Sequence, residues 1–88
     1  MPQVEKPIRL SGHARQQIEF RGAWEQEVVE AIRNERWKAA EGDRNECRRD
    51  FVFAAMWNKK RYATKQVRPV FVEESDEIVV VTLYVYYF

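Results

Sequence analysis

The chain has 88 residues, with 15 basic and 14 acidic side chains and a formal net charge of +1. Apolar residues make up 45% and charged residues 33%, too much apolar content for a disordered chain and too much charge for a membrane protein. We therefore expect a single domain, residues 1–88, with a small core. The length and composition exclude a multidomain enzyme, a repeat array and a coiled coil.

Cys47 is the only cysteine and His13 the only histidine, so the sequence predicts neither an internal disulfide nor a metal site. Cys47 has no identifiable base nearby in the sequence, and we interpret it as structural. The N-terminus lacks the apolar segment of a signal peptide, and the longest apolar run, residues 78–88, is too short to span a bilayer as a helix. We expect a cytoplasmic protein that has no cofactor and does not associate with a membrane.

The first third of the chain predicts an extended arm followed by two helices. Two prolines indicate an arm or edge strand over residues 1–9. A first helix is expected at residues 12–21, because Ser11 can cap its start and Gly22 can take the left-handed conformation at its end. Apolar side chains recur on one side of residues 24–36, which predicts a second helix. Together the two helices occupy residues 10–36.

The remainder, residues 37–88, predicts an antiparallel sheet. Segments with strand character are residues 37–40, 51–57, 64–73 and 78–88. Residues 41–46 indicate a loop and residues 58–61 a polar break. The last strand is apolar on both sides, so we expect it in the centre of the sheet. The sequence therefore predicts an α+β domain with two N-terminal helices packed on one face of a small antiparallel sheet.

The pairing of the last two strands decides which side chains share a face. A three-residue turn after Glu73 would place Arg68 opposite Thr82 and Gln66 opposite Tyr84. A two-residue turn would instead place Arg68 opposite an apolar residue. We prefer the first register because it pairs polar with polar side chains. It predicts an apolar face under the helices and a partly open face that carries polar and aromatic groups.

Basic residues are concentrated between Arg48 and Arg68, where seven basic side chains oppose one acidic side chain. Trp57 and Tyr62 are interleaved with them, as in surfaces that bind phosphates and stack bases. The residues expected to bind nucleic acid are Arg48, Arg49, Lys59, Lys60, Arg61 and Lys65. The alternative is an ordinary solvated face that keeps the strand edges soluble.

The candidate catalytic residues are His13, Arg68 and Tyr84. His13 lies near the rim of the buried side of the first helix, where it could act as a general acid or base. Its alternative role is packing, with a hydrogen bond to a backbone carbonyl or to Ser11. Arg68 beside tyrosine hydroxyl groups could hold a phosphate and stabilise its developing charge. The alternative is a tyrosine-rich packing face, covered by the N-terminal arm or by a second chain.

Three short motifs resemble an uncharacterised bacterial family that begins Ser-x-His-Ala-Arg. They are Ser11-Gly12-His13-Ala14-Arg15, Phe20-Arg21-Gly22 and Val81-Thr82. That family lies near the RelE/ParE-like and BrnT-like toxins, small domains with two helices followed by an antiparallel sheet, some of which cut mRNA on the ribosome. The resemblance implies a RelE-like fold, with His13, Arg15 and Arg21 at the family positions. Trp24 departs from the pattern, since the family commonly has a capping serine there.

Two functional hypotheses follow. The first is a toxin-like domain that acts on RNA through its basic and aromatic face, as a metal-independent endoribonuclease, with a cognate antitoxin covering the sheet. The second is a non-catalytic protein-interaction module, expected to be a homodimer, that uses the aromatic face or the C-terminal strand.

Overall fold

The structure is a computed structural model that describes residues 6–88, and residues 1–5 of the predicted arm lie outside the described part. Within residues 6–88 the chain forms two helices, α1 (Gly12–Arg21) and α2 (Glu25–Asn34), and one mixed sheet of six strands. The strands are β1 (Ile8–Leu10), β2 (Lys38–Ala39), β3 (Asn45–Glu46), β4 (Arg49–Trp57), β5 (Lys60–Glu73) and β6 (Ile78–Tyr87). The predicted α+β class is confirmed.

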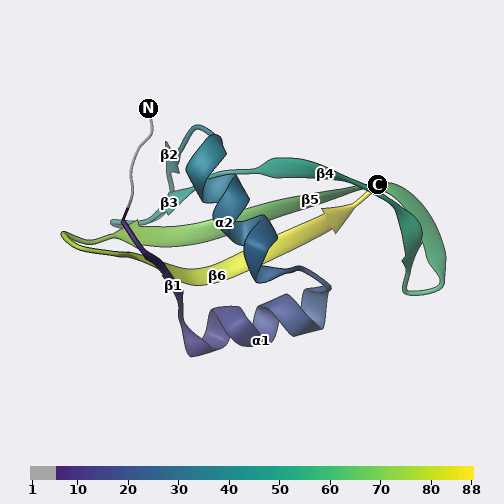
Figure 1. Cartoon of the computed structure of the whole chain (residues 1–88), viewed down its shortest axis with the longest axis horizontal. Coiled ribbons are helices and arrows are strands. Elements are labelled where there is room, and N and C mark those ends of the chain that lie inside the picture. The colour runs from purple at the N-terminus through teal and green to yellow at the C-terminus, as the bar shows by residue number, and fades with distance from the viewer. Residues whose placement is uncertain (1–5) are drawn as a thin grey trace.

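The sheet is mixed, whereas the sequence predicted an antiparallel one. Its strands follow the order β1-β6-β5-β3-β2, and β4 also pairs with β5. β1 runs parallel to the start of β6, with Ile8 opposite Ile78 and Leu10 opposite Val80 (Figure 1). β6 therefore lies between β1 and β5 only along its first residues. The parallel pair forms because residues 8–10, the end of the expected arm and the residue after it, bury Leu10 against the apolar start of β6.

The first helix has the predicted bounds. Ser11 Oγ accepts a hydrogen bond from the Ala14 amide at 3.1 Å, and Gly22 adopts a left-handed φ of 77° while its N–H donates to the Ile18 carbonyl. These contacts satisfy backbone groups that a helix leaves unpaired at its ends. Gly22 is thus required by its backbone conformation.

The second helix ends two residues earlier than predicted, at Asn34. It begins directly after Trp24, whose backbone N–H donates a hydrogen bond to the Glu27 carboxylate at 3.0 Å. The Glu27 side chain therefore satisfies a backbone donor at the start of the helix, where a serine cap is absent. Near its end the Trp37 indole N–H donates to the Ile32 carbonyl at 2.8 Å. This bond satisfies one of the last free carbonyls and directs the chain away from the helix axis.

Strands β3, β4 and β5 extend into segments where the sequence predicted breaks. The predicted break at residues 58–61 is reduced to a two-residue turn at Asn58 and Lys59, both of which have positive φ, as a type I′ hairpin requires. β5 therefore begins at Lys60. The predicted loop at residues 41–46 contains the short strand β3, which pairs with β5.

The register of β5 and β6 differs by two residues from the preferred prediction. Glu73 pairs with Ile78 across a longer loop, and a β-bulge further along β5 adds a second one-residue shift, so Arg68 lies opposite Tyr84 rather than Thr82. At residues 71–73 the register is displaced by one residue, and from Val70 back to Lys65 the two shifts together keep each side chain on its predicted face. The expected partners on the outer face are therefore wrong, but the sorting of polar and apolar residues is retained.

The core joins both helices to the sheet. α1 contacts β6 and α2 contacts β5 (Figure 1). The largest fully buried side chains include Ile32 of α2, Phe71 of β5 and Leu83 of β6. Trp37 packs edge-on against Phe71 with ring centroids 4.8 Å apart. Burial of these apolar groups holds α1 and α2 against β6 and β5.

Gly22→Ala is expected to destabilise the protein by about 2–4 kcal/mol, for two reasons. A Cβ at that position would lie 2.5 Å from the Trp57 ring, and the alanine would have to adopt the left-handed backbone conformation. Gly42→Ala is the matched control, since Gly42 has a φ of 68° and nothing lies within 4 Å of its added Cβ. That control should lose only about 1 kcal/mol. Urea unfolding measures both, and equal losses would show that Trp57 does not pack on Gly22.

Candidate functional site

The outward side of β6 carries the side chains of Thr82, Tyr84 and Tyr86, which we call the β6 strip. Successive side chains of a strand point to opposite faces, and the intervening Leu83 is fully buried in the core. Tyr84 is 37% exposed. The strip is therefore open, and the predicted catalytic residues Tyr84 and Arg68 are direct neighbours across β5 and β6.

Arg68 is held firmly by its surroundings. Its Nε and Nη2 atoms donate to Glu46 Oε1 at 2.9 and 2.7 Å, and Nη1 donates to the Tyr86 hydroxyl at 2.9 Å. The hydrogen bonding of Arg68 to the Glu46 carboxylate is the main cause that raises the pKa of Arg68 above its ordinary value. The buried Glu46 carboxylate therefore balances much of the charge of Arg68, which still retains N–H donors outside these three bonds.

Arg21, at the end of α1, reaches the same ring from another direction. Its Cζ atom lies 5.6 Å from the centre of the Tyr84 ring, and the Cζ of Arg68 lies 5.0 Å from that centre. Arg21 Nε donates to Gln17 Oε1 at 2.6 Å, and no carboxylate within residues 6–88 forms an ion pair with it. Residue patterns alone missed Arg21; only the family resemblance named its position.

His13 lies near the other end of the strip. It is exposed, whereas the sequence placed it at a buried rim, and its Nε2 atom is 3.2 Å from Thr82 Oγ1. The helix turns His13 further outward than the apolar pattern indicated, so neither a backbone carbonyl nor Ser11 is its partner. His13 contacts Thr82 and Arg21 contacts Tyr84. These two β6 residues are two positions apart, so their Cα atoms are separated by roughly 7 Å. α1 thus brings His13 and Arg21 to the same strand.

Lys65 is not part of an open basic surface. It was expected to bind nucleic acid, but it is only 3% exposed. Its ammonium lies 3.0 Å from Glu27 Oε2 and 3.0 Å from the Gly22 carbonyl. Burial of a charge requires such compensation, so Lys65 joins β5 to the two helices and is unavailable to a phosphate in this structure.

The other residues expected to bind nucleic acid are divided between two places. Arg48 is exposed beside Arg49, whose Nη1 forms an ion pair with Glu35 at 2.7 Å. Lys59, Lys60 and Arg61 are exposed at the tip of the β4–β5 hairpin. The basic segment is therefore continuous in sequence but divided in space between these two places.

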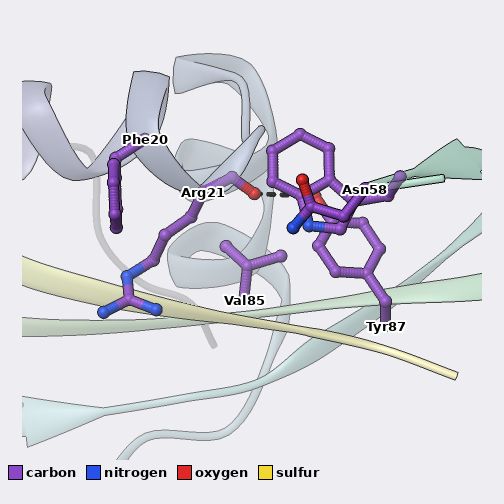
Figure 2. A pocket seen from close by; sticks show the side chains of 6 residues that line it. Phe20, Arg21, Asn58, Val85 and Tyr87 are labelled. Carbon is purple, nitrogen blue, oxygen red and sulfur yellow. Dashed lines mark hydrogen bonds between the residues drawn. The ribbon is translucent and has the colours of Figure 1, made fainter.

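A pocket of about 290 Å³ lies between the end of α1 and the β4–β5 hairpin, and we call it the hairpin pocket. Its lining residues are Phe20, Arg21, Trp57, Asn58, Val85 and Tyr87. Figure 2 shows Phe20 and Arg21 descending from the helix on one side of Val85, with Asn58 and Tyr87 on the other side. The Tyr87 hydroxyl donates to the Arg21 carbonyl at 2.7 Å. No acidic side chain lines this pocket, so its electrostatic character is cationic.

Residues 6–88 contain no cluster of three or more His, Cys, Asp or Glu side chains with an arrangement that could hold a metal ion. Neither α1 nor α2 has the length and apolar character needed to cross a membrane. The side chains on and beside the β6 strip carry imidazole, guanidinium, phenol and hydroxyl groups.

Cys47 is buried, and burial raises the pKa of its thiol to about 12. The unfolded chain should lose this proton near its ordinary pKa of 9.0, so stability is retained below pH 9 and falls as the pH rises towards 12. The loss should reach at most about 1.4 kcal/mol per pH unit. We expect Cys47→Ala to show a weaker alkaline decline in urea unfolding between pH 8 and 11. Parallel declines would contradict a buried, protonated thiol.

The chain was compared with known proteins in three ways. Neither a protein-family model, nor a curated protein, nor a solved structure matches it. The function of the protein is therefore inferred from the geometry of the β6 strip and the hairpin pocket.

Proposed function

We propose that this protein is a small RNA-directed domain of the RelE-like toxin type, which binds single-stranded RNA along the β6 strip. The observation that carries the proposal is the position of Tyr84, an exposed ring approached by the guanidinium groups of Arg21 and Arg68. Arginine side chains bind phosphates, and exposed aromatic rings stack on bases. A surface that combines both fits an unpaired polynucleotide.

The two arginines have different parts in this proposal. Arg21 has no acidic partner within residues 6–88, so its charge is available to a phosphate. Arg68 is neutralised largely by Glu46 and is held in one orientation by three hydrogen bonds. We therefore assign phosphate attraction mainly to Arg21 and the alignment of a bound phosphate to Arg68.

Cleavage of the bound RNA is the second part of the proposal. In a metal-independent reaction the RNA 2′-hydroxyl attacks the adjacent phosphorus, a base removes the hydroxyl proton, and an acid protonates the departing 5′-oxygen. His13 and Tyr84 lie along one strip and are the groups we assign to proton transfer. The remaining N–H donors of Arg68 would stabilise the charge that develops on the phosphate oxygens.

The RelE-like arrangement of the fold belongs to the same proposal. Residues of α1, α2, β5 and β6 share one core cluster, among them Ala14, Val28, Val67 and Leu83. Val67 and Leu83 alternate in sequence with Arg68 and Tyr84, which lie outside that cluster. This alternation supports a core on one face of β5 and β6 and the proposed ligand surface on the other. α1 lies beside β6, so its His13 and Arg21 reach the ligand surface, and an antitoxin is the partner that would cover that surface.

Arg21→Ala should weaken binding of a fluorescein-labelled single-stranded RNA by roughly tenfold, because one charge-assisted phosphate contact is lost. The slope of log affinity against log salt should also decrease by about 0.7. Fluorescence anisotropy at several salt concentrations measures both quantities. Arg9→Ala is the control, since Arg9 is also an exposed arginine but pairs with Glu77 near the parallel β1–β6 pair. Equal effects of the two substitutions would count against the β6 strip.

His13→Ala and Tyr84→Phe should each reduce cleavage of a defined RNA at least a hundredfold, because each removes a group assigned to proton transfer. Arg15→Ala is the control on α1, as Arg15 is exposed and pairs with Glu25 at 3.4 Å. Gel analysis of single-turnover reactions supplies the rates. Absence of cleavage by the unaltered protein on RNA that it binds would remove the catalytic part and leave RNA binding.

A homodimeric interaction module is the second candidate, favoured by the exposed aromatic rings at the end of the chain. Tyr84, Tyr86 and Phe88 are all exposed. Analytical ultracentrifugation distinguishes the two functions: a dimer that dissociates on Tyr86→Ala would favour the interaction module, whereas a monomer that binds RNA would favour the first proposal.

A further inference from the structure

The hairpin pocket lies on the face of β6 that carries Val85 and Tyr87, and it shares Arg21 with the β6 strip on the other face. We propose that this pocket receives one unpaired base of the bound RNA where the RNA passes the edge of β6, an inference that rests on the proposed function and deepens it. Phe20 is the first reason. Its ring is 73% exposed at the opening of the pocket, on the last turn of α1. An apolar ring left in water gains free energy when a flat aromatic partner covers it, and every base has such a face.

The back of the pocket is rigid. The Trp57 indole stacks on the Tyr87 ring with centroids 5.1 Å apart and an angle of 19° between the planes. The Tyr87 hydroxyl in turn donates a hydrogen bond to the Arg21 carbonyl, and burial raises the pKa of that hydroxyl. A pocket whose walls are already fixed loses little entropy on binding a ligand.

Polar groups are present where the edge of a base would lie. Arg21 and Asn58 line the pocket, and Figure 2 shows their polar ends on different sides of Val85. The Asn58 amide both donates and accepts hydrogen bonds, whereas Arg21 only donates. The edges of bases carry donors and acceptors of both kinds. The volume of about 290 Å³ is at the lower limit of ligand pockets, which fits one ring system rather than a larger ligand.

The charge around the pocket favours a polyanion. Lys59, Lys60 and Arg61 directly follow Asn58 in the chain and are exposed at the hairpin tip. Arg21 lines the pocket from the α1 side, and the three cations of the hairpin follow directly on its lining residue Asn58. Phosphates on either side of an inserted base would find a positive partner. A neutral apolar peptide would gain nothing from these charges, and for that reason we assign the pocket to RNA.

The test compares two labelled RNAs of eight nucleotides, one with uracil at every position and one with the same backbone but abasic sites. Fluorescence anisotropy should give five- to fiftyfold tighter binding of the uracil RNA by the unaltered protein, the range expected for stacking of one base. Phe20→Ala should lower this ratio severalfold, leaving the part that stacking on Tyr84 contributes, and should leave the affinity for the abasic RNA unchanged. Asn58→Gly should also lower the ratio, and it preserves the turn because Asn58 has a φ of 52°.

Trp24→Ala is the matched control, because Trp24 is 69% exposed but lies outside the pocket, and it should leave the ratio unchanged. Equal affinity of the unaltered protein for the two RNAs, or an equal effect of Phe20→Ala and Trp24→Ala, would overturn the base pocket. If both RNAs still bound and Arg21→Ala still weakened them, the proposed function would survive that result. Failure of both RNAs to bind would overturn the pocket and the proposed function together.

Discussion

The contact between the last turn of α1 and the sheet is the constraint on which the functional surface depends. At Gly22 the helix ends in a left-handed conformation, and the absent side chain leaves room for the Trp57 ring. The Gly22 carbonyl accepts a hydrogen bond from the Lys65 ammonium, and the neighbouring Arg21 carbonyl accepts one from the Tyr87 hydroxyl. These contacts orient α1 so that His13 and Arg21 lie along β6, and they form one wall of the hairpin pocket.

The charged side chains of the protein divide into those that stabilise the fold and those that remain available. Lys65 with Glu27, and Arg68 with Glu46, are largely buried pairs whose charges compensate one another. Such pairs specify how elements fit together more than they add stability. Arg21 and the hairpin lysines have a different position: Arg21 is half-buried and lines a pocket without carboxylates, and Lys59 and Lys60 are exposed at the hairpin that supplies Trp57 and Asn58 to this pocket. The near-zero net charge of the chain therefore conceals a local cationic region.

Sequence reasoning predicted the elements that have strong local signals. Ser11 and Gly22 mark the ends of α1 by cap chemistry, and alternation along β6 placed Arg68 and Tyr84 on one face. It failed where long-range contacts decide. The parallel pairing of residues 8–10 with β6, the burial of Lys65 and the approach of Arg21 to Tyr84 all join residues far apart in the chain. Their local sequence gives no signal of the partner.

The hairpin pocket could not be predicted for the same reason. Phe20 and Trp57 are separated by more than a third of the chain, and each by itself has the pattern of an ordinary core residue. The most direct test of the account is a titration of ¹⁵N-labelled protein with single-stranded RNA, followed by amide chemical shifts. The account predicts the largest shifts at residues 13–21, 57–61 and 82–87. Shifts confined to α2 and β2, or none at all, would contradict it.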